Sequence, residues 1–494
     1  MTHPMTEIPT ERLRAALERA GQLLAVHGAL PATIQGLTDD SRQVGAGNCF
    51  VAVRGSARDG HTFLDAVVAA GAACAIVEDA AGVAVPAMVV RESRVAAAVA
   101  AAAFYEEPAA SLRFVGVTGT NGKSTTVGIL RHLLDGPGAL SASIGTLGVL
   151  VGGEGRPLPG GSGLTTPGPI ELQRVLRALV DAGVRTVAME CSSHALDQGR
   201  VLGVRFDAAV FTNLTRDHLD YHGTMEAYRD AKARLVDLLS PTGTAVVNAD
   251  DRWWDALPPA PHRLTFGLVA PADVRCAALA LTPNGSAFTL ETPGHHVPAS
   301  LPLMGDFNVA NALGAVGAAV ALGLDAETIA ARLATVPQVS GRLELLSRRP
   351  TVLRDYAHTP DAYERVLTAL RPYTPGRIIL VFGCGGDRDR GKRPLMAAAA
   401  HRYADHLILT DDNPRTEDPE QILNDICAVL PTGAYDRIRD RREGIARALS
   451  MADPERDLVL LVGKGPDTYQ IFGTTKVPFD EKTIVEDLLA ERGS

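Results

Sequence analysis

The chain of 494 residues has few cysteines, no long apolar run and no excess of basic residues. Its six cysteines include no Cys-x-x-Cys pair, so neither a zinc knuckle nor a redox dithiol is expected. Six cysteines in so long a chain do not form a disulfide scaffold, and we predict a reducing, cytoplasmic compartment. The longest apolar runs, 95–104 and 312–324, fall short of the roughly 18 residues that a membrane span needs. The N-terminal stretch lacks the pattern of a signal peptide, so we expect no membrane insertion.

The formal net charge of -9 argues against unspecific binding to nucleic acid, which needs a basic surface. It leaves room for a local basic pocket that binds a phosphorylated ligand. Hydrophobic residues make up 46% of the chain and charged residues 21%, which is typical of a globular protein and excludes a disordered one. At roughly 100–200 residues per domain, the length predicts about three domains.

Short apolar runs alternate with helical patterns along the chain, which predicts an α/β fold with mostly parallel sheets covered by helices on both faces. We expect a smaller N-terminal α/β domain at 1–108, a central phosphate-loop domain at 109–340 and a C-terminal Rossmann-like domain at 341–494. The first boundary falls at Pro108, because a residue before proline is biased away from helix. Predicted strands lie at 112–117, 186–189, 208–211, 244–247, 378–382, 406–410 and 458–462.

The strongest local motif is the heptad Gly119-Thr120-Asn121-Gly122-Lys123-Ser124-Thr125, which stands between a predicted strand and a predicted helix. Its glycines let backbone N–H groups surround an anion, the helix N-terminus adds partial positive charge, and Lys123 adds a full one. The Ser124 hydroxyl can ligate Mg²⁺. Val117 stands where the strict P-loop pattern has its first glycine. We interpret the heptad as a phosphate loop rather than a glycine turn that caps a helix.

Three other places in the sequence are weaker candidates for a site that binds phosphate and Mg²⁺. Glu190 follows the predicted strand 186–189, and an acidic residue at the carboxyl edge of an open sheet is a natural Mg²⁺ ligand. Its alternative role is that of a neighbour to a helix N-cap. His218 and His222 lie four residues apart, which would put them on one face of a helix, but such a pair is a weak metal motif. Lys232, taken alone, resembles any lysine on a helix surface.

The heptad is similar to that of the Mur ligases and their relatives, the folylpolyglutamate synthetases. The resemblance covers almost the whole chain and rests on long motifs in family order. They are Asp40-Ser41-Arg42, Thr165-Thr166-Pro167, Glu190-Cys191-Ser192-Ser193-His194-Ala195-Leu196, Phe211-Thr212-Asn213-Leu214-Thr215-Arg216-Asp217-His218-Leu219-Asp220-Tyr221-His222-Gly223, Asp355-Tyr356-Ala357-His358-Thr359-Pro360-Asp361, Phe382-Gly383-Cys384-Gly385-Gly386-Asp387-Arg388-Asp389, Gly391-Lys392-Arg393-Pro394 and Asp412-Asn413-Pro414-Arg415.

The resemblance implies an ADP-forming amide ligase of peptidoglycan biosynthesis. ATP would phosphorylate the D-Glu γ-carboxylate of UDP-MurNAc-L-Ala-D-Glu, and an amine of a diamino acid would attack the acyl phosphate. The implied partners are these small molecules and two Mg²⁺ ions. We expect no nucleic-acid partner, and we expect a monomer. Two other classes stay open: a folylpolyglutamate synthetase, and a P-loop switch or motor ATPase that hydrolyses ATP without joining anything.

The resemblance also implies roles for individual residues. The catalytic group is Lys123, Lys232, His218 and Glu190. Ser124 and Glu190 would hold one Mg²⁺, and His218 with a carbamylated Lys232 the other. The ATP site is Gly119, Thr120, Asn121, Gly122, Lys123, Ser124, Thr125, Asn308, Asn311, Arg342, Asp355 and His358. The UDP-substrate site is Asp39, Ser41, Ser56, Ala57, Arg58, Thr165, Thr166, Ser193, Gln198 and Arg200. The diamino-acid site is Arg388, Asp412, Asn413, Pro414, Arg415, Gly463 and Asp467.

The motif that contains Arg415 bears on which diamino acid is added. Family members that add meso-diaminopimelate usually have Asp-Asn-Pro-Arg, with the Arg on the distal carboxylate, and lysine-adding members commonly lack that Arg. Arg415 therefore favours meso-diaminopimelate. The same members usually have Gly-Lys-Gly-His-Glu near the C-terminus, where this chain has Gly463-Lys464-Gly465-Pro466-Asp467. That departure leaves L-lysine and L-ornithine open.

Overall fold

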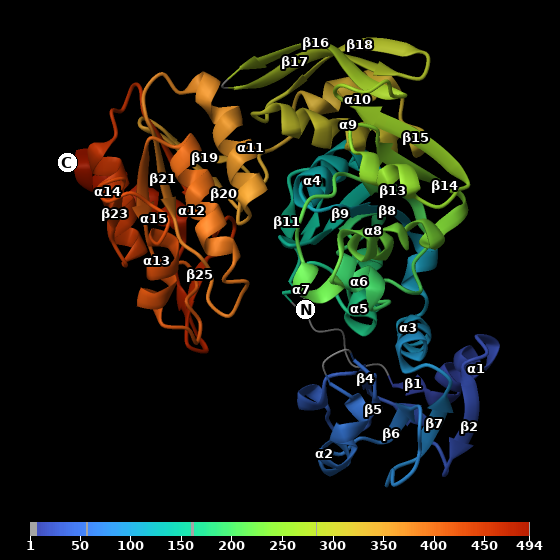
Figure 1. Cartoon of the computed structure of the whole chain (residues 1–494). Helices are drawn as coiled ribbons and strands as arrows, with labels where there is room; N and C mark the ends of the chain where they lie inside the picture. Colours follow the sequence, from blue (N-terminus) through green and yellow to red (C-terminus); the bar gives the residue numbers. More distant parts are fainter. Residues whose placement is uncertain (1–6, 56–57, 160–162, 283, 494) are drawn as a thin grey trace.

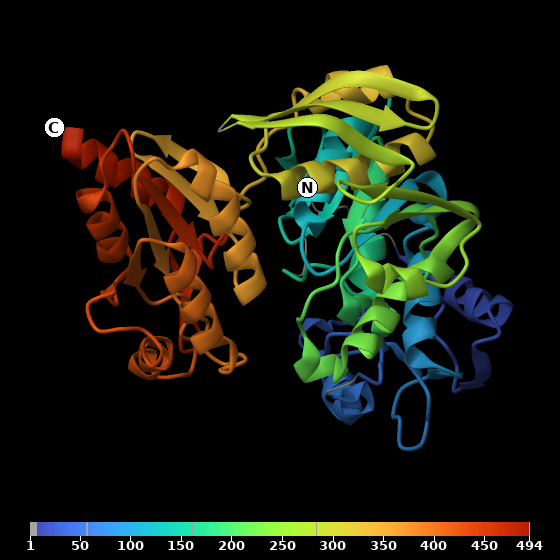
Figure 2. The same cartoon turned by 45° about the horizontal axis from the view of Figure 1, so that its top comes forward.

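The structure, a computed structural model, describes residues 7–55, 58–159, 163–282 and 284–493. It has three α/β domains, each built on its own main sheet, and this confirms the predicted fold class. Figures 1 and 2 show the C-terminal domain (orange to red) beside the central one, away from the N-terminal domain (blue). Across the described ranges, no helix combines the length and apolar character of a membrane span.

The N-terminal domain has a five-stranded sheet in the order β2–β7–β6–β5–β4, in which β4 to β7 are parallel. Its apolar core packs between this sheet and the helices α1 and α3. The strands are β1 (Ile8–Pro9), β2 (Leu23–His27), β3 (Thr33–Ile34), β4 (Gly36–Thr38), β5 (Asn48–Val51), β6 (Cys74–Val77) and β7 (Ala87–Val90). The helices are α1 (Thr10–Arg19), α2 (Leu64–Ala69) and α3 (Ser93–Phe104).

The central domain has an eleven-stranded sheet in the order β11–β10–β9–β12–β8–β13–β14–β15–β16–β17–β18. The run from β9 to β16 is parallel, as predicted, and antiparallel strands extend both edges. The strands are β8 (Arg113–Thr118), β9 (Leu140–Gly145), β10 (Gly148–Val151), β11 (Arg156–Pro157), β12 (Val184–Glu190), β13 (Phe206–Phe211), β14 (Leu239–Asn248), β15 (His262–Gly267), β16 (Val274–Thr282), β17 (Gly285–Thr292) and β18 (His295–Leu301). The helices are α4 (Lys123–Leu134), α5 (Pro169–Asp181), α6 (Ser193–Asp197), α7 (Leu219–His222), α8 (Met225–Ala233), α9 (Asp306–Ala321) and α10 (Ala326–Leu333).

Both faces of the central sheet carry an apolar core. Phe114 of β8 belongs to the core that includes α5, and its neighbour Val115 belongs to the opposite core, which includes α4 and α9. Successive strand residues point to opposite faces, so a strand that is buried on both sides must be apolar at nearly every position. This explains why these strands appear in the sequence as continuous apolar runs.

The C-terminal domain has a six-stranded sheet in the order β19–β20–β24–β21–β22–β23, parallel from β20 to β23. Its strands are β19 (Glu344–Arg348), β20 (Thr351–Asp355), β21 (Ile378–Phe382), β22 (His406–Leu409), β23 (Tyr435–Arg437) and β24 (Leu458–Val462), with the hairpin β25 (Tyr469–Phe472) and β26 (Thr475–Pro478). Its helices are α11 (Pro360–Leu370), α12 (Lys392–Tyr403), α13 (Pro419–Cys427), α14 (Arg441–Met451) and α15 (Glu481–Gly493).

The chain order of these strands places the motifs. The heptad follows β8 and Glu190 ends β12, so both lie at the carboxyl edge of the central parallel sheet. In the C-terminal domain Asp355 ends β20, and the segments 410–415 and 463–467 follow β22 and β24. Ligands of open α/β sheets bind at this edge.

Candidate active site

One large cleft lies between the central and C-terminal domains, and it is lined by the carboxyl edges of both sheets. The central wall carries the phosphate loop, Glu190 and the start of α9. The opposite wall carries the segment 355–358, Arg388 and the residues that follow β22 and β24. The cleft therefore brings together motifs that lie as much as 347 residues apart in this chain, as the pair Thr120 and Asp467 shows.

The phosphate loop needs its glycines for steric reasons. Gly119 and Gly122 have φ of 144° and 86°, a backbone region that residues other than glycine rarely adopt. A Cβ at Gly122 would collide with the side chain of Asn311. Lys123 Nζ donates to the carbonyl oxygens of Gly119 (3.0 Å) and Thr120 (2.8 Å), and desolvation lowers the pKa of the ammonium. These contacts hold the lysine over the loop in which a phosphate would bind.

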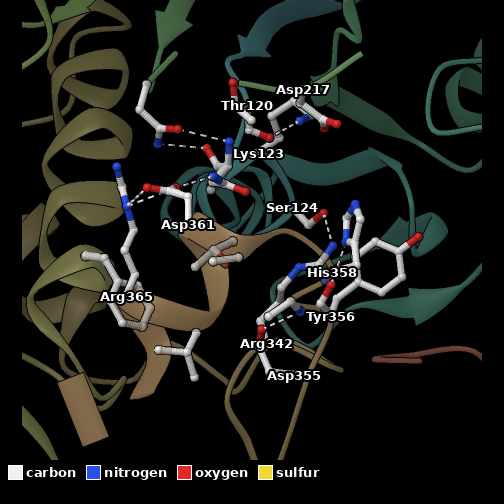
Figure 3. A pocket seen from close by; sticks show the side chains of 18 of the residues that line it. Thr120, Lys123, Ser124, Asp217, Arg342, Asp355, Tyr356, His358, Asp361 and Arg365 are labelled. Carbon is white, nitrogen blue, oxygen red and sulfur yellow. Dashed lines mark hydrogen bonds and ion pairs between the residues drawn. The ribbon is translucent and has the colours of Figure 1, made fainter. Parts of the chain in front are cut away.

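Ser124, the next residue, connects the loop to both domains. Its Oγ donates to Glu190 Oε1 at 2.9 Å and accepts from Arg342 Nη2 at 2.9 Å. Arg342 comes from the junction with the C-terminal domain, and Figure 3 shows its guanidinium directed at Ser124. Glu190 is 2% exposed and also accepts from the backbone N–H of Thr146 at 2.8 Å. A hydroxyl beside a carboxylate is the type of donor set that Mg²⁺ prefers.

Lys232 proves to be buried rather than exposed on a helix surface. Its side chain extends from α8, is 1% exposed, and donates from Nζ to the carbonyl of Gly119 at 2.7 Å. Nζ also lies 4.5 Å from the centre of the Tyr228 ring. Burial, and then the neighbouring Lys123 cation, lower the pKa of Lys232 well below the usual lysine range. Lys232 can therefore take up its neutral amine form.

His218 lies near Lys232 but in a looser environment. Its φ is 53°, and Nε2 lies 3.4 Å from Asp217 Oδ2. Partial desolvation lowers the pKa of the imidazole to about 4. Over the described part of the chain, no three His, Cys, Asp or Glu side chains gather into a metal cluster. The predicted second Mg²⁺ site thus depends on Lys232 becoming an oxygen ligand.

The other predicted ATP residues lie on the two walls of the cleft. Asn308 and Asn311 are buried in the first turns of α9, and Asn311 Nδ2 donates to Asn308 Oδ1 at 3.3 Å. Asp355 is buried and accepts the backbone N–H groups of Leu343 (2.8 Å) and Ala357 (2.7 Å), which fixes the backbone on both sides of it. His358 Nδ1 lies 2.7 Å from the carbonyl of Tyr356.

Three of the predicted substrate residues of the central domain, Thr166, Gln198 and Arg200, are linked by hydrogen bonds, with Arg200 Nη1 donating to the carbonyl of Thr166 at 3.4 Å. Arg200 Nη2 donates to Gln198 Oε1 at 2.6 Å, and Thr166 Oγ1 donates to the carbonyl of Glu190 at 2.8 Å. His222, which the sequence leaves without a role, has Nε2 2.9 Å from Ser193 Oγ. Thr165 lies in the cleft, where its hydroxyl is 3.3 Å from that of Thr146.

The described UDP-binding candidates of the N-terminal domain, Asp39, Ser41 and Arg58, are not among the residues that line this cleft. Asp39 and Arg58 are exposed, and Ser41 opens a short 3-10 helix that the Asp40 carboxylate caps through the backbone N–H of Arg42. This is the Asp/Ser turn that the residue types favour. Ser56 and Ala57 lie outside the described residues.

Two of the predicted diamino-acid residues, Asp412 and Asn413, lie beside a buried lysine that the prediction did not include. Lys464 is fully buried, with Nζ 3.4 Å from Asn413 Oδ1 and 3.7 Å from Asp412 Oδ1. Its place in the segment Gly463-Lys464-Gly465-Pro466-Asp467, which resembles a family motif, is the sequence signal that could have found it. A Cβ at Gly463 would lie 2.7 Å from Asp412 Oδ2, so glycine permits this close approach.

The remaining predicted diamino-acid residues, apart from Pro414, line the same wall. Arg415 Nη1 donates to the carbonyl of Gly386 at 2.7 Å, and Arg388 is exposed in the cleft. Burial raises the pKa of the Asp467 carboxyl. Pro414 is buried beside Asn413.

Two contacts that join the walls were also not predicted. Lys392 Nζ, from α12, pairs with Asp217 Oδ1 of the central domain at 2.7 Å. Asn121 Nδ2 of the phosphate loop donates to Asp361 Oδ2 of α11 at 3.4 Å. Lys392 and Asp361 belong to motifs quoted above, but their partners lie 175 and 240 residues away in sequence.

Known proteins match this chain along its length. Models described as "Mur ligase family, catalytic domain", "Mur ligase middle domain" and "Mur ligase, glutamate ligase domain" match residues 33–117, 117–319 and 341–465. A protein of Synechococcus elongatus named UDP-N-acetylmuramoyl-L-alanyl-D-glutamate--2,6-diaminopimelate ligase is 46% identical, over 95% of this chain and 96% of its own. One of the same name from Geobacillus kaustophilus is 44% identical, over 94% and 97%.

A solved structure of a protein with that name is also similar. It is 33% identical, has a TM-score of 0.68, and covers 99% of this chain and 100% of its own. Three consecutive domain matches, full-length relatives and a shared three-domain architecture agree with one another. The chain belongs to the Mur ligase family.

Proposed function

We propose that this protein uses ATP to join meso-2,6-diaminopimelate to the D-Glu of UDP-MurNAc-L-Ala-D-Glu in peptidoglycan biosynthesis. The observation that carries the proposal is the placement of the phosphate loop and the Asp412–Arg415 segment on opposite walls of one cleft. A ligase that makes an acyl phosphate and then delivers an amine to it needs this arrangement. The full-length relatives named for the same reaction support it.

Around the phosphate loop, Lys123 and Arg342 bind and neutralise the γ-phosphate, and the loop 119–125 orients it. Phosphoryl transfer spreads negative charge over equatorial oxygens, so cations and positioning are the main requirements. Ser124 and Glu190 have the donor chemistry to hold one Mg²⁺, which would supply further charge neutralisation. Asn308 and Asn311 contact the adenine, and Asp355 and His358 bind on the ribose and base side.

Lys232 is carbamylated in the active enzyme under this proposal. Reaction with CO₂ requires a neutral amine, and burial of Lys232 beside Lys123 favours that form. The product is an anion with two oxygens in place of a cation. With His218 it forms a donor set for the second Mg²⁺, which the unmodified ammonium would repel.

On the opposite wall, Arg388 and Arg415 bind carboxylates of the diamino acid, because a guanidinium matches a carboxylate with two parallel hydrogen bonds. Asp412, Asn413 and Asp467 bind its ammonium group. Pro466 stands where diaminopimelate-adding relatives usually have histidine, so L-lysine and L-ornithine are the alternative substrates. The group around Thr166, Ser193, Gln198 and Arg200 binds the UDP-linked dipeptide between the two walls.

The wider setting follows from the same reaction. The substrates are small molecules, and we propose a monomer that acts in the cytoplasm. All six cysteines are free thiols, which suits a reducing compartment. A folylpolyglutamate synthetase would accept a folate in place of the UDP-linked dipeptide, and a P-loop switch or motor would hydrolyse ATP without either substrate.

The test is phosphate release from ATP and Mg²⁺ with UDP-MurNAc-L-Ala-D-Glu, adding meso-diaminopimelate, L-lysine or L-ornithine separately. We expect release with meso-diaminopimelate only, and we expect Arg415→Met to raise the KM for it. Arg349→Met, at an exposed position of the same domain, is the matched control. Release only with lysine or ornithine would overturn the amino-acid assignment. Release without an amine, or no release with any of the three, would overturn the ligase.

A further inference from the structure

Tyr356 lies between Arg342, which reaches the phosphate loop, and the loop 463–467. The guanidinium carbon of Arg342 is 4.5 Å from the centre of the Tyr356 ring. The same guanidinium donates from Nη2 to Ser124 Oγ at 2.9 Å. Figure 3 shows Tyr356, Arg342 and Ser124 in sequence along the side of the pocket. The ring of Tyr356 therefore supports the arginine that reaches the phosphate loop.

The loop 463–467 packs against the same tyrosine. Gly465 has φ of 50°, and a Cβ built on it would lie 2.6 Å from Tyr356 Cβ and 2.7 Å from Cδ2. So close an approach is open to glycine alone, and it transmits any displacement of the loop to the ring. Packed interiors do not deform continuously, so such a displacement must be accommodated by neighbouring side chains.

The backbone around Arg342 touches this loop as well. Gly341 has φ of 64°, and a Cβ there would collide with the backbone nitrogen of Pro466. Asp355 anchors the chain beside Tyr356 through its hydrogen bonds to Leu343 and Ala357. The loop, the domain junction and the tyrosine thus form one packed unit.

We propose that Tyr356 is a positioning residue that couples binding of the diamino acid at 463–467 to the engagement of Arg342 with the nucleotide. An arginine over an aromatic face is held by cation–π attraction, which strengthens when water is excluded. Binding of the diamino acid at the loop 463–467 tightens the packing of that loop against the Tyr356 ring. The ring then holds the guanidinium of Arg342 at Ser124. The inference rests on the proposed function, because it takes 463–467 as part of the diamino-acid site.

The experiment compares three variants by isothermal titration of a non-hydrolysable ATP analogue. Each is titrated with saturating UDP-MurNAc-L-Ala-D-Glu, with and without meso-diaminopimelate. Tyr356→Phe keeps the ring, and Tyr356→Leu removes it. Tyr403→Leu is the matched control, because Arg402 lies over Tyr403 at 5.2 Å on α12, outside the lining of the cleft.

We expect meso-diaminopimelate to tighten nucleotide binding in the wild type, in Tyr356→Phe and in Tyr403→Leu alike. In Tyr356→Leu the analogue should bind roughly 5- to 30-fold more weakly, and the diamino acid should no longer tighten it. If Tyr356→Leu does not fold, Tyr356→Met is read in the same way, because methionine fills irregular gaps. Folding is checked by circular dichroism.

Two outcomes overturn the proposal. One is wild-type nucleotide affinity and wild-type tightening in Tyr356→Leu. The other is an equal loss in Tyr356→Phe, which would show that the hydroxyl rather than the ring matters. If wild-type protein releases no phosphate with any diamino acid, the proposed function fails separately. Nucleotide affinity alone then decides the role of Tyr356, and equal values for wild type and Tyr356→Leu refute it.

Discussion

Glu481→Gln should destabilise the C-terminal domain and weaken binding at the diamino-acid site that this domain carries. Arg441 and Glu481 are both fully buried, with Arg441 Nε 2.8 Å from Glu481 Oε1. Arg441 also donates to Thr410 Oγ1 at 3.0 Å and to the carbonyl of Val462 at 2.9 Å. Thr410 directly follows β22 and Val462 ends β24, so these two residues lead into the segments 411–415 and 463–467. The Arg441–Glu481 pair thus holds in place the points from which both segments of the diamino-acid site begin.

Removing one partner of a buried ion pair typically costs about 3–5 kcal/mol, because the remaining charge is left without its counter-charge. Glutamine keeps the volume of Glu481 and can still accept one hydrogen bond, so we expect the lower end, about 3 kcal/mol. With a urea m-value of roughly 1–3 kcal/mol per molar, the unfolding midpoint of this domain should fall by about 1–3 M. The KM for the diamino acid should rise in parallel.

The assay must follow the unfolding of each domain separately, because a three-domain chain does not unfold in one step. Trp253 and Trp254 are the only tryptophans and both lie in the central domain, so fluorescence follows that domain. Hydrogen exchange in β22 and β24 follows the C-terminal one.

The control is Glu455→Gln. Glu455 pairs with Arg349 at 3.4 Å on the surface, where loss of a pair costs at most about 1 kcal/mol. If hydrogen exchange in β22 and β24 changes no more in Glu481→Gln than in the control, the buried pair does not stabilise the domain as predicted. A matching shift in tryptophan fluorescence would show that the effect is not confined to this domain.

Three further outcomes are expected. Lys232→Met should abolish phosphate release, and ¹³C NMR with labelled bicarbonate should show a carbamate signal in the wild type that the variant lacks. Burial raises the pKa of Asp467, and only the ionised carboxylate attracts an ammonium. The KM for the diamino acid should therefore rise as pH falls through that raised pKa, above the usual aspartate range, and Asp467→Asn should flatten the profile. Gly341→Ala should lower kcat and cost roughly 1–2 kcal/mol in urea unfolding from left-handed backbone strain alone, with more from the clash with Pro466; wild-type kcat and midpoint would contradict this.

Much of the fold is readable from local sequence pattern. The apolar runs of the central domain predict β8, β12 and β13 to within a few residues, because strands buried on two faces have little choice of composition. The phosphate loop is equally local, since its glycines, lysine and serine act within one turn of chain. The family motifs add the order of the domains.

The roles of single charged residues are different. Lys232 has the sequence context of a surface lysine, and only the packing of α8 against the phosphate loop buries it. Lys464 and the Lys392–Asp217 pair likewise depend on how distant segments meet. Helical and strand periodicity states which face of an element is buried, but not which partner covers it. The α/β architecture and the phosphate loop are therefore readable from local sequence. Which side chains share the cleft depends on contacts between residues far apart in the chain, so it is visible only in the folded molecule.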